Sequence, residues 1–527
     1  MKPSGDPSSP TRPAPPTLAD DGLAGLLRAR ATGDPDGVHT RINGVPLTFG
    51  TLDRRASACA AALRARGIEP GDHVAVMLRN GAANLVVIFG LAKAGIVWVP
   101  INVRQRGDGL AYLLHHSQPK LLVVEADLAV VVEEALGPDA QLKMLVNGGD
   151  EFAPLAAALR SGHVYDAPAP DPEATAAIMY TSGTTGPPKG VIVSHRMMRL
   201  AAEAVARVSV ARPNDVFFVW EALYHIGGAQ LLLLPMTHGI QLAMVERFSA
   251  SQFWEQVHAE GATHIHYLGG ILQILLKQPP GPHDHSHRVR IAWGGGCPPH
   301  IWRQFEERFG VEIHECYGMT ETSSIATINI SGVVGSVGKA LPWFSVELCD
   351  ADGRSGADHE RGEIVVRTTI PGAIFSGYFR DPEATAKALR GGALYTGDLG
   401  SWDRDGNLVF HGRMTDSVRC RGENVSAWEV EHVADTHPAI EDCAMIGVAA
   451  DIGEQEIKLF VKPRKGFRID PGALSSWLST RLASYQNPRY ICVVDEFQRT
   501  ASQRIIKRTL PAAANDCWDR DAANRLL

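Results

Sequence analysis

The sequence has no pair of cysteines spaced to bind zinc or to act as a redox dithiol. No Cys-x-x-Cys motif is present. The eight cysteines stand singly, at Cys59, Cys297, Cys316, Cys349, Cys420, Cys443, Cys492 and Cys517. We interpret them as scattered reduced thiols, which are typical of cytoplasmic proteins.

An excess of basic residues is also missing. The chain has 51 Lys and Arg against 58 Asp and Glu, for a formal net charge of -7 at pH 7. Proteins that wrap nucleic acid usually present a strong positive field. We therefore expect no nucleic-acid partner, although a local cationic pocket fits within so balanced a total.

Long uninterrupted apolar runs are absent as well. The most apolar stretch, residues 84–101, contains Lys93 and two glycines, and it is predicted to be a buried helix followed by a strand. The first residues, MKPSGDPSSPTRPAPP, lack the apolar segment of a secretory signal and are predicted to form a flexible tail over 1–17. These features predict a cytoplasmic protein without a membrane partner.

The rest of the sequence predicts an α/β protein with at least two parts. From Leu18 to about Phe410, short β-branched runs alternate with alanine-rich helical patterns, as in strands of largely parallel sheets joined by crossover helices. Glycine and charge then cluster, and the remaining hundred or so residues resemble a smaller α+β unit. We predict a body over 18–412 and a small domain over 413–527, with a hinge near Arg413.

The strongest local signal is YTSGTTGPPKGV, from Tyr180 to Val191. Glycines allow close backbone approach, hydroxyls donate hydrogen bonds and Lys189 adds a cation, so the string predicts a polyphosphate cradle. A Walker A loop is excluded because Pro188 precedes the lysine where that motif needs glycine. The residues predicted to hold phosphate are Thr181, Ser182, Gly183, Thr184, Thr185, Gly186 and Lys189.

This string resembles the phosphate-loop signature of the acyl- and aryl-adenylate-forming superfamily, which includes acyl-CoA ligases. YGMTE (317–321), RGEIVVR, SGYFRDPEAT, YTGDLG (395–400) and HGR (411–413) resemble further signatures of that family and follow in the expected order. RGENVS (421–426) is most similar to the crotonobetaine/carnitine-CoA ligase branch. The resemblance implies a large N-terminal domain of α/β subdomains with largely parallel sheets, and a small mobile α+β C-terminal domain.

The resemblance also implies ATP, Mg²⁺ and coenzyme A as reactants and cofactors. A carboxylate attacks the α-phosphorus of ATP, so cations and fixed donors must relieve the repulsion between two anions. By resemblance, Glu321 helps to hold Mg²⁺, while Thr320 and Lys189 contact phosphate oxygens.

Four further residues have roles by the same resemblance. Tyr317 lies against adenine, Asp398 accepts hydrogen bonds from the ribose hydroxyls, and Arg413 donates to ribose or phosphate. Gly422 lines the pantetheine tunnel once the small domain has rotated.

Recognition of the acid is less legible in the sequence. Tyr224 and His225 stand where the family carries an aromatic–histidine pair beside the carboxylate, and a buried structural histidine is the alternative for His225. By the same resemblance, the acyl pocket is floored by Gly294, Gly295 and Gly296, whose lack of side chains permits a wide or long pocket. His264 and His266 share one strand face, and we expect a core or pocket-lining role over metal binding.

The sequence departs from the family near its C-terminus. Relatives carry a Gly-Lys pair whose lysine bridges the acyl carboxylate and the α-phosphate, and here Gln503 and Arg504 occupy those positions. The nearest lysine is Lys507, which shares a face with Arg504 on a helix but points away from it on a strand. Because a guanidinium is a planar fork and an ammonium a compact donor, the exchange predicts weakened adenylation.

Three functional hypotheses follow from these residues. The leading one is an ATP- and Mg²⁺-dependent acyl-CoA ligase that activates a small-molecule carboxylic acid through acyl-AMP and transfers the acyl group to CoA. The second is an enzyme specialised for one half-reaction, because Gln503 and Arg504 replace Gly-Lys. The third is a nucleotide or acyl-AMP binding protein without turnover. A homodimer is compatible with each of them.

Overall fold

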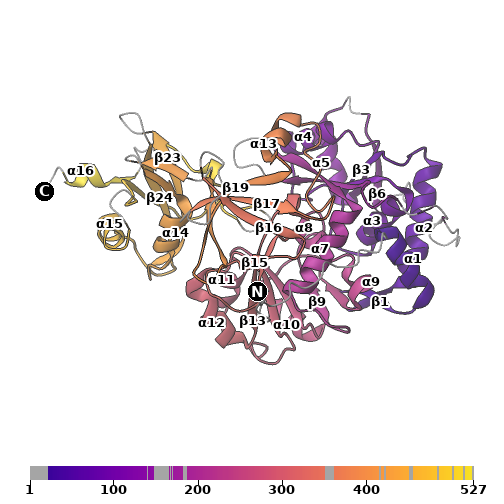
Figure 1. Cartoon of the computed structure of the whole chain (residues 1–527), viewed down its shortest axis with the longest axis horizontal. Helices are drawn as coiled ribbons and strands as arrows, with labels where there is room; N and C mark the ends of the chain where they lie inside the picture. Colours follow the sequence, from indigo (N-terminus) through magenta and orange to yellow (C-terminus); the bar gives the residue numbers. More distant parts are fainter. Residues whose placement is uncertain are drawn as a thin grey trace, which may run out of the picture.

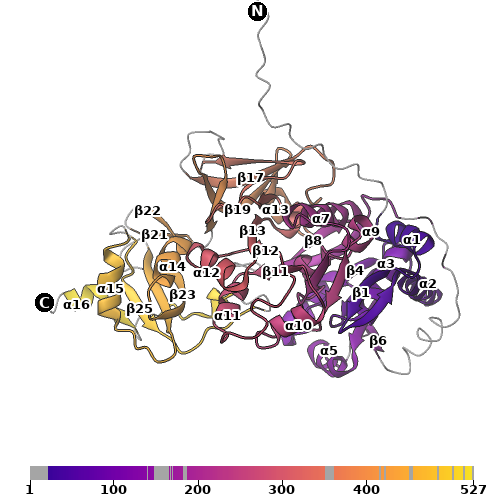
Figure 2. The same ribbon diagram turned by 90° about the horizontal axis from the view of Figure 1, so that it is seen from below.

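A large body and a smaller C-terminal unit make up the molecule. The computed structural model describes residues 22–138, 141–147, 165, 168, 170–181, 187–350, 361–414, 417–420, 423–449, 455–482, 486–500, 504–513 and 517–524. In both views the C-terminal elements, in orange and yellow, gather at one end, away from the N-terminal helices in indigo (Figure 1 and Figure 2). The predicted tail, 1–17, lies outside the described residues.

The first sheet of the body has six strands, parallel except for the last pair. In spatial order they are β6 (Lys143–Asn147), β5 (Leu121–Glu125), β3 (His73–Met77), β4 (Val97–Pro100), β7 (Thr175–Thr181) and β8 (Lys189–Ser194). The associated helices are α1 (Leu23–Gly33), α2 (Phe49–Ala65), α3 (Ala82–Ala94), α4 (Gly107–Ser117) and α5 (Ala129–Leu136). Alternate residues of β3 face two different hydrophobic clusters, which explains why the strand is apolar on both faces.

The second sheet has nine strands, parallel through its centre and antiparallel at its ends. Their spatial order is β15 (Lys339–Ala340), β14 (Thr327–Asn329), β13 (Glu312–Tyr317), β12 (Ile291–Gly295), β11 (His264–Leu268), β9 (Val216–Val219), β10 (Gln241–Met244), β1 (Val38–Ile42) and β2 (Val45–Thr48). Its helices are α7 (His195–Val208), α8 (Ile226–Ala229), α9 (Leu234–His238), α10 (Phe253–Ala259), α11 (Ile271–Leu276) and α12 (Pro299–Phe309). One continuous core joins this sheet to the first.

A third sheet of the body is antiparallel, which the alternation of strands and helices did not separate from the parallel sheets. Its strands are β16 (Phe344–Cys349), β17 (Gly362–Thr368), β18 (Leu389–Arg390), β19 (Ala393–Trp402) and β20 (Leu408–Arg413), with α13 (Pro382–Ala388) before β18. Short connections suit antiparallel neighbours, whereas parallel strands need a crossover. The largely parallel fold class predicted for the chain is confirmed, with this sheet added.

The C-terminal unit has its own hydrophobic core. A two-stranded ribbon, β21 (Ser417–Cys420) and β22 (Glu423–Ser426), precedes a four-stranded sheet. That sheet contains β23 (Ile440–Ala449), β24 (Gln455–Pro463), β25 (Tyr490–Val493) and β26 (Trp518–Asp519), and the helices are α14 (Ala427–Asp435), α15 (Pro471–Ser479) and α16 (Arg520–Asn524). The small α+β unit is therefore confirmed, while the boundary at Arg413 stays a prediction.

Aromatic rings and one ion pair connect the two parts. Trp428 of α14 stacks on His432 with ring centroids 4.8 Å apart and meets the edge of His411, on β20, at 5.6 Å. His432 in turn lies 6.5 Å from the ring of His300, on α12. Close by, Lys277 Nζ lies 3.3 Å from Glu441 Oε1. We call the rings of His300, His411, Trp428 and His432 the interdomain ring ladder.

The apolar stretch at 84–101 forms the buried helix α3 and the strand β4, as predicted. Lys93 is buried within it, and its Nζ lies 2.6 Å from Asp53 Oδ1 on α2. A buried ammonium needs such a partner, so the charge that breaks the apolar run is neutralised inside the body. Among the described residues, no helix combines the length and the apolar character that crossing a bilayer requires.

Candidate active site

The base of the phosphate loop is the hairpin of β7 and β8. Thr181, the last residue of β7, pairs with Lys189, the first of β8. The loop residues between them, Ser182, Gly183, Thr184, Thr185 and Gly186, lie outside the described residues. Lys189 Nζ lies 5.0 Å from the ring centre of Tyr378, within cation–π range. The hairpin therefore places Lys189 at the base of the predicted cradle.

Glu321 lies on the 3₁₀ turn Thr320–Thr322, which follows the YG of the YGMTE string. Both Thr320 and Glu321 are 7% exposed. Tyr378 Oη donates a hydrogen bond to Glu321 Oε1 at 2.8 Å, while the amide of Phe375 donates to the Glu321 carbonyl at 2.9 Å. Tyr378 thus joins Glu321 to Lys189, residues far apart along the chain.

Sequence reasoning gave Tyr378 no role, although it lies in SGYFRDPEAT, which was recognised as a family signature. Backbone hydrogen bonds fix it here, because the Phe379 amide donates to the Gly190 carbonyl at 2.7 Å and the Ile192 amide to that of Gly377 at 3.2 Å. A Cβ on Gly190 would lie 2.8 Å from Ile178 Cγ2, so the strand packs tightly at this point. The signature string was the available signal.

Tyr317, the last residue of β13, and Arg413, the last residue of β20, meet at Asp398 in the middle of β19. Tyr317 Oη donates to Asp398 Oδ2 at 2.8 Å, and Arg413 Nε lies 3.6 Å from Asp398 Oδ1. Burial raises the pKa of Asp398 to about 6, although Arg413 and Tyr317 oppose that shift. Among the described residues, Asp398 Oδ1 has no hydrogen-bond donor, which leaves it available to a ligand hydroxyl.

Arg504 reaches the same region from the C-terminal unit. Its guanidinium interacts electrostatically with Asp398, Arg413 and Glu221, and it keeps solvent contact. The surrounding protein and the like charge of Arg413 lower its pKa, whereas the two carboxylates oppose that shift. An Arg499–Ile505 bridge and hydrogen bonds between Thr500 and Arg504 join the backbone on either side of residues 501–503, which lie outside the described residues.

Lys507 lies within the C-terminal unit. Residues 504–506 are extended and the 3₁₀ turn Lys507–Thr509 begins only afterwards, so the two cations do not share a helical face. Lys507 Nζ lies 2.7 Å from Glu431 Oε1, and that oxygen also accepts a hydrogen bond from the Met445 amide. Of the two candidate cations, Arg504 is the one whose charge interacts with Asp398.

The aromatic–histidine pair opens α8, with the rings of Tyr224 and His225 4.7 Å apart at 65°. Burial lowers the pKa of His225, and the neighbouring Glu221 opposes that shift. His225 Nε2 is buried and has no hydrogen-bond partner among the described residues. A structural histidine usually satisfies both ring nitrogens, so the orphaned nitrogen favours the substrate-binding interpretation over the structural one.

The structure shows a backbone requirement for glycine at 294 and 296 that the sequence interpretation did not include. A Cβ on Gly294 would lie 1.9 Å from the Tyr267 carbonyl oxygen, and one on Gly296, where φ is 93°, would lie 3.3 Å from Gly269. These glycines let β12 approach β11 closely, in addition to any space they leave for an acyl group. Whether they also floor an acyl pocket stays a prediction.

Glu315 on β13 supports this glycine segment from below. Its carboxylate accepts hydrogen bonds from the amides of Gly296 and Cys297, and from Tyr267 Oη at 2.6 Å. Burial raises the pKa of Glu315 to about 8, even though all three donors favour the ionised form. Sequence reasoning missed this residue, because a lone glutamate two positions before YG carries no recognisable signal.

We expect Glu315→Gln to destabilise the body by about 1–3 kcal/mol, because an amide group offers one accepting oxygen to three donors. Urea denaturation followed by circular dichroism measures this change. Glu312→Gln, on the same strand but exposed, is the matched control and should leave stability unchanged. Equal stability of both variants would mean that the three hydrogen bonds do not hold the glycine segment.

The site suits a magnesium ion carried in with a nucleotide. Mg²⁺ in phosphate-transfer sites takes one or two carboxylates together with phosphate oxygens and water. The described residues include no group of three or more histidine, cysteine, aspartate and glutamate side chains able to hold a metal alone. Glu321 is a buried carboxylate joined through Tyr378 to the lysine at the phosphate loop, so it would supply the one protein carboxylate that such an ion takes beside nucleotide phosphates.

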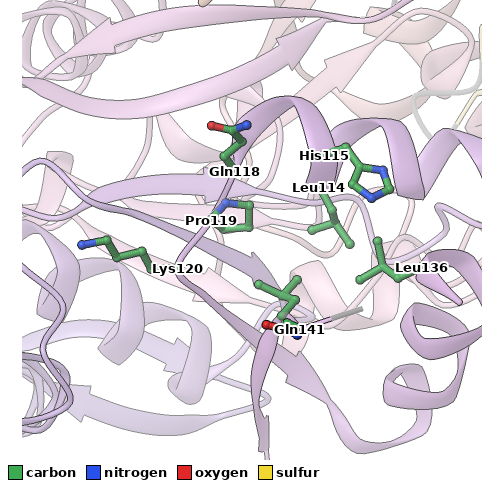
Figure 3. A pocket seen from close by; sticks show the side chains of 8 residues that line it. Leu114, His115, Gln118, Pro119, Lys120, Leu136 and Gln141 are labelled. Atoms are coloured by element: carbon green, nitrogen blue, oxygen red, sulfur yellow. The ribbon is translucent and has the colours of Figure 1, made fainter. Parts of the chain in front are cut away.

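A hollow of about 410 Å³ lies elsewhere on the body (Figure 3). Side chains of the C-terminal end of α4 and the segment after it line it, together with Leu136 of α5 and residues just before β6. None of the predicted site residues lines this hollow. We therefore place the active site at the residues described above and not here.

The fold and the site together define a two-part adenylate-forming enzyme, and comparison with known proteins agrees. The AMP-binding enzyme family matches residues 27–379, and the AMP-binding enzyme C-terminal domain matches residues 429–504. The chain is 32% identical to sulfoacetate–CoA ligase of Cupriavidus necator, over 92% of this chain and 96% of that protein. It is 31% identical to crotonobetaine/carnitine–CoA ligase of Salmonella heidelberg, over 88% of this chain and 92% of that protein.

Solved structures agree with the sequence comparisons. The ATP-bound crystal structure of MatB from Rhodopseudomonas palustris superimposes with a TM-score of 0.82 at 26% identity, over 93% of this chain and 98% of that one. The chain belongs to the AMP-binding enzyme family. It is an AMP-forming acyl-CoA ligase, an enzyme of the acid–thiol ligase class. The predicted family, its crotonobetaine/carnitine-type likeness and the leading function are confirmed, and the two alternative functions are not favoured.

Proposed function

We propose that this chain completes both half-reactions of an acyl-CoA ligase, with Arg504 as the cation that bridges the acyl carboxylate and the α-phosphate. The observation that carries the proposal is the position of Arg504, whose charge interacts with Asp398, Arg413 and Glu221 around one region. A guanidinium supplies the positive charge that two approaching anions need, although its geometry differs from that of an ammonium.

In the first half-reaction, residues of the body orient ATP. Lys189 and the phosphate loop hold phosphate oxygens, Asp398 accepts from the ribose hydroxyls, and Arg413 donates to ribose or phosphate. Tyr317 positions Asp398 through its 2.8 Å hydrogen bond and presents its ring to adenine. Glu321 would hold Mg²⁺, which supplies charge neutralisation on the phosphates. The acid then attacks the α-phosphorus beside Tyr224 and His225, and pyrophosphate leaves.

In the second half-reaction, we propose that the C-terminal unit turns about a hinge near Arg413 and presents the Gly422 segment to coenzyme A. The thiol attacks the acyl-AMP carbonyl, forming the thioester and releasing AMP. Using one site for two steps in turn lets each step exclude water. The rings and the Lys277–Glu441 ion pair between the two parts are contacts that such a turn would exchange.

The proposal is tested by incubating the purified protein with ATP, Mg²⁺ and CoA and a wide panel of aliphatic, aromatic and polycyclic acids. AMP should appear in equal amount with thioester for at least one acid, and omission of Mg²⁺ should abolish both. Each half-reaction is then measured alone, by acid-dependent pyrophosphate exchange and by thioester formation from chemically made acyl-AMP. A protein active in one half-reaction only would contradict the proposal.

The raised pKa of Asp398 predicts a loss of nucleotide affinity in acid. Above about pH 6 the carboxylate is ionised and accepts from the ribose hydroxyls, whereas below it the protonated group loses that capacity. We therefore expect the KM for ATP to rise about tenfold for each pH unit below 6. Initial rates from pH 5 to pH 8 measure this. In Asp398→Asn the KM should be higher throughout and nearly independent of pH over that range.

Two finer expectations rest on the same family membership. We propose a cytoplasmic location, and a homodimer stays a prediction that light scattering of the purified protein tests directly. Neither affects the residues assigned to the site.

A further inference from the structure

A buried carboxylate that the reaction does not require lies beside the proposed acyl site. Glu221 follows β9, two residues after its end, and is 6% exposed. Asn80 fixes the backbone around it, because Asn80 Nδ2 donates to the Glu221 carbonyl at 2.9 Å and Asn80 Oδ1 accepts from the Leu223 amide at 3.1 Å. The carboxylate is therefore held in one place by a rigid support.

The surroundings of this carboxylate are shaped for it and leave it incompletely partnered. A Cβ on Gly227 would lie 2.4 Å from both Glu221 oxygens, so any other residue there would displace the carboxylate. His266 Nδ1 lies 2.8 Å from Oε2. This ion pair holds the carboxylate at Oε2, whereas no described residue donates a hydrogen bond to Oε1, and the nearby His225 Nε2 is buried without a hydrogen-bond partner among the described residues. Glu221 Oε1 and His225 Nε2 are therefore available to a ligand.

The position of Glu221 connects the two features assigned to acyl recognition. His225 lies four residues further along, and His266 pairs in register with Trp293 on β12, with the two rings 4.3 Å apart. The next residue of β12 is Gly294, the first of the glycine segment. The carboxylate therefore pairs with a histidine on β11, the strand beside the glycine strand, and interacts electrostatically with His225 of the aromatic–histidine pair.

Glu221 is charged in spite of its burial. Burial opposes ionisation, but His266, His225 and Arg504 together hold the pKa of Glu221 below its ordinary value. No hydrogen bond joins Glu221 to Arg504 among the described residues, so the arginine does not complete the partners of the carboxylate. His266 provides a partner for Oε2 only, and because a carboxylate accepts several hydrogen bonds, a donor on a ligand fits the remaining oxygen, Oε1.

We propose that the acid activated by this enzyme carries an N–H or O–H donor on its acyl chain, and that this group binds to Glu221. The inference rests on the proposed acyl-CoA ligase activity and adds the class of acid. A plain hydrocarbon chain leaves Glu221 Oε1 without a donor, and a second carboxylate on the substrate meets like charge. Both are therefore poor substrates, whereas amino, ammonium and hydroxyl acids are favoured.

The experiment compares acids that differ in one group. Two matched sets are 4-aminobutyrate, 4-hydroxybutyrate, pentanoate and glutarate, and 4-aminobenzoate, 4-hydroxybenzoate, 4-methylbenzoate and terephthalate. In at least one set, the donor-bearing acids should exceed the methyl and dicarboxylate members by about tenfold or more in kcat/KM for AMP release.

Variants of Glu221 then assign this preference to the carboxylate. Glu221→Leu should reverse the preference toward the methyl acids, and Glu221→Gln should keep activity with hydroxyl acids but lose the advantage of a protonated amine. Glu255→Leu, an exposed glutamate on α10, should leave every ratio unchanged. Thermal melting and ATP binding identify the variants that fold. If Glu221→Leu does not fold, Glu221→Gln alone is sufficient for the test.

The outcomes separate this inference from the proposed function. Absence of AMP release with every acid overturns the ligase proposal itself. Turnover with a preference that Glu221→Leu does not alter overturns the present inference and leaves the ligase intact. An equal loss of kcat/KM for all acids in the Glu221 variants also overturns it, because the carboxylate would then act on Arg504 and not on the substrate.

Discussion

Arg504→Ala should lower acyl-AMP formation by about 100- to 1,000-fold, the usual cost of removing one preorganised charged donor. Thioester formation from chemically made acyl-AMP and CoA should change little, because the attack of the thiol on the mixed anhydride does not bring two full anions together. Acid-dependent pyrophosphate exchange measures the first step, and thioester absorbance measures the second. This split between half-reactions is the signature of an adenylation residue.

Three variants keep this prediction sharp. Arg508→Ala removes an exposed arginine nearby and should leave both half-reactions intact. Arg504→Lys restores the ammonium that relatives carry and should retain more adenylation than Arg504→Ala. Lys507→Ala breaks the 2.7 Å contact with Glu431 and should reduce stability slightly while preserving adenylation. Loss of adenylation in Lys507→Ala but not in Arg504→Ala would show that Lys507, and not Arg504, is the adenylation cation.

Glu321→Gln should also lower acyl-AMP formation by about 100- to 1,000-fold. The amide keeps the shape of the side chain and can still accept from Tyr378 Oη, so the loss reports the missing negative charge and not a local collapse. Titration of pyrophosphate exchange with Mg²⁺ should show that the variant needs a much higher concentration of the ion than the wild type.

Two comparisons test this role for Glu321. Tyr378→Phe removes only the hydroxyl that orients the carboxylate, and we expect a smaller loss, about tenfold. Glu383→Gln on α13 changes an exposed glutamate and should have no effect. A Glu321→Gln enzyme with an unchanged Mg²⁺ titration would show that the carboxylate acts through the protein alone.

The sequence predicted the identities of the site residues better than it predicted the contacts between them. Motif order identified Lys189 and Glu321, but the tyrosine that joins them depends on backbone hydrogen bonds between the 377–379 segment and β8, and such long-range register leaves no local pattern. The apolar run at 84–101, interrupted by Lys93 and two glycines, identified the buried helix α3 correctly because the composition of one short stretch is a local property. The alternation of strands and helices did not separate the antiparallel sheet, because short β-branched strands look alike in both kinds of sheet.

The choice between Arg504 and Lys507 shows the same limit in one segment. The sequence left open whether residues 504–507 are helical, and only the extended backbone with its Arg499–Ile505 bridge directs the two cations to different places. Glu221 was passed over for another reason. A single glutamate after an apolar strand resembles a surface charge until its burial, its pairing with His266 and the glycine opposite it are known.

The interdomain ring ladder affects the free energy needed to move the C-terminal unit relative to the body. The stacked pair at 4.8 Å lies within α14, and the ring contacts at 5.6 Å and 6.5 Å are the members of this ladder that cross between the two parts. A junction built from directional hydrogen bonds would instead require several to break at once. The Lys277–Glu441 ion pair is partly exposed and worth about 0–1 kcal/mol, so little free energy is lost when it separates.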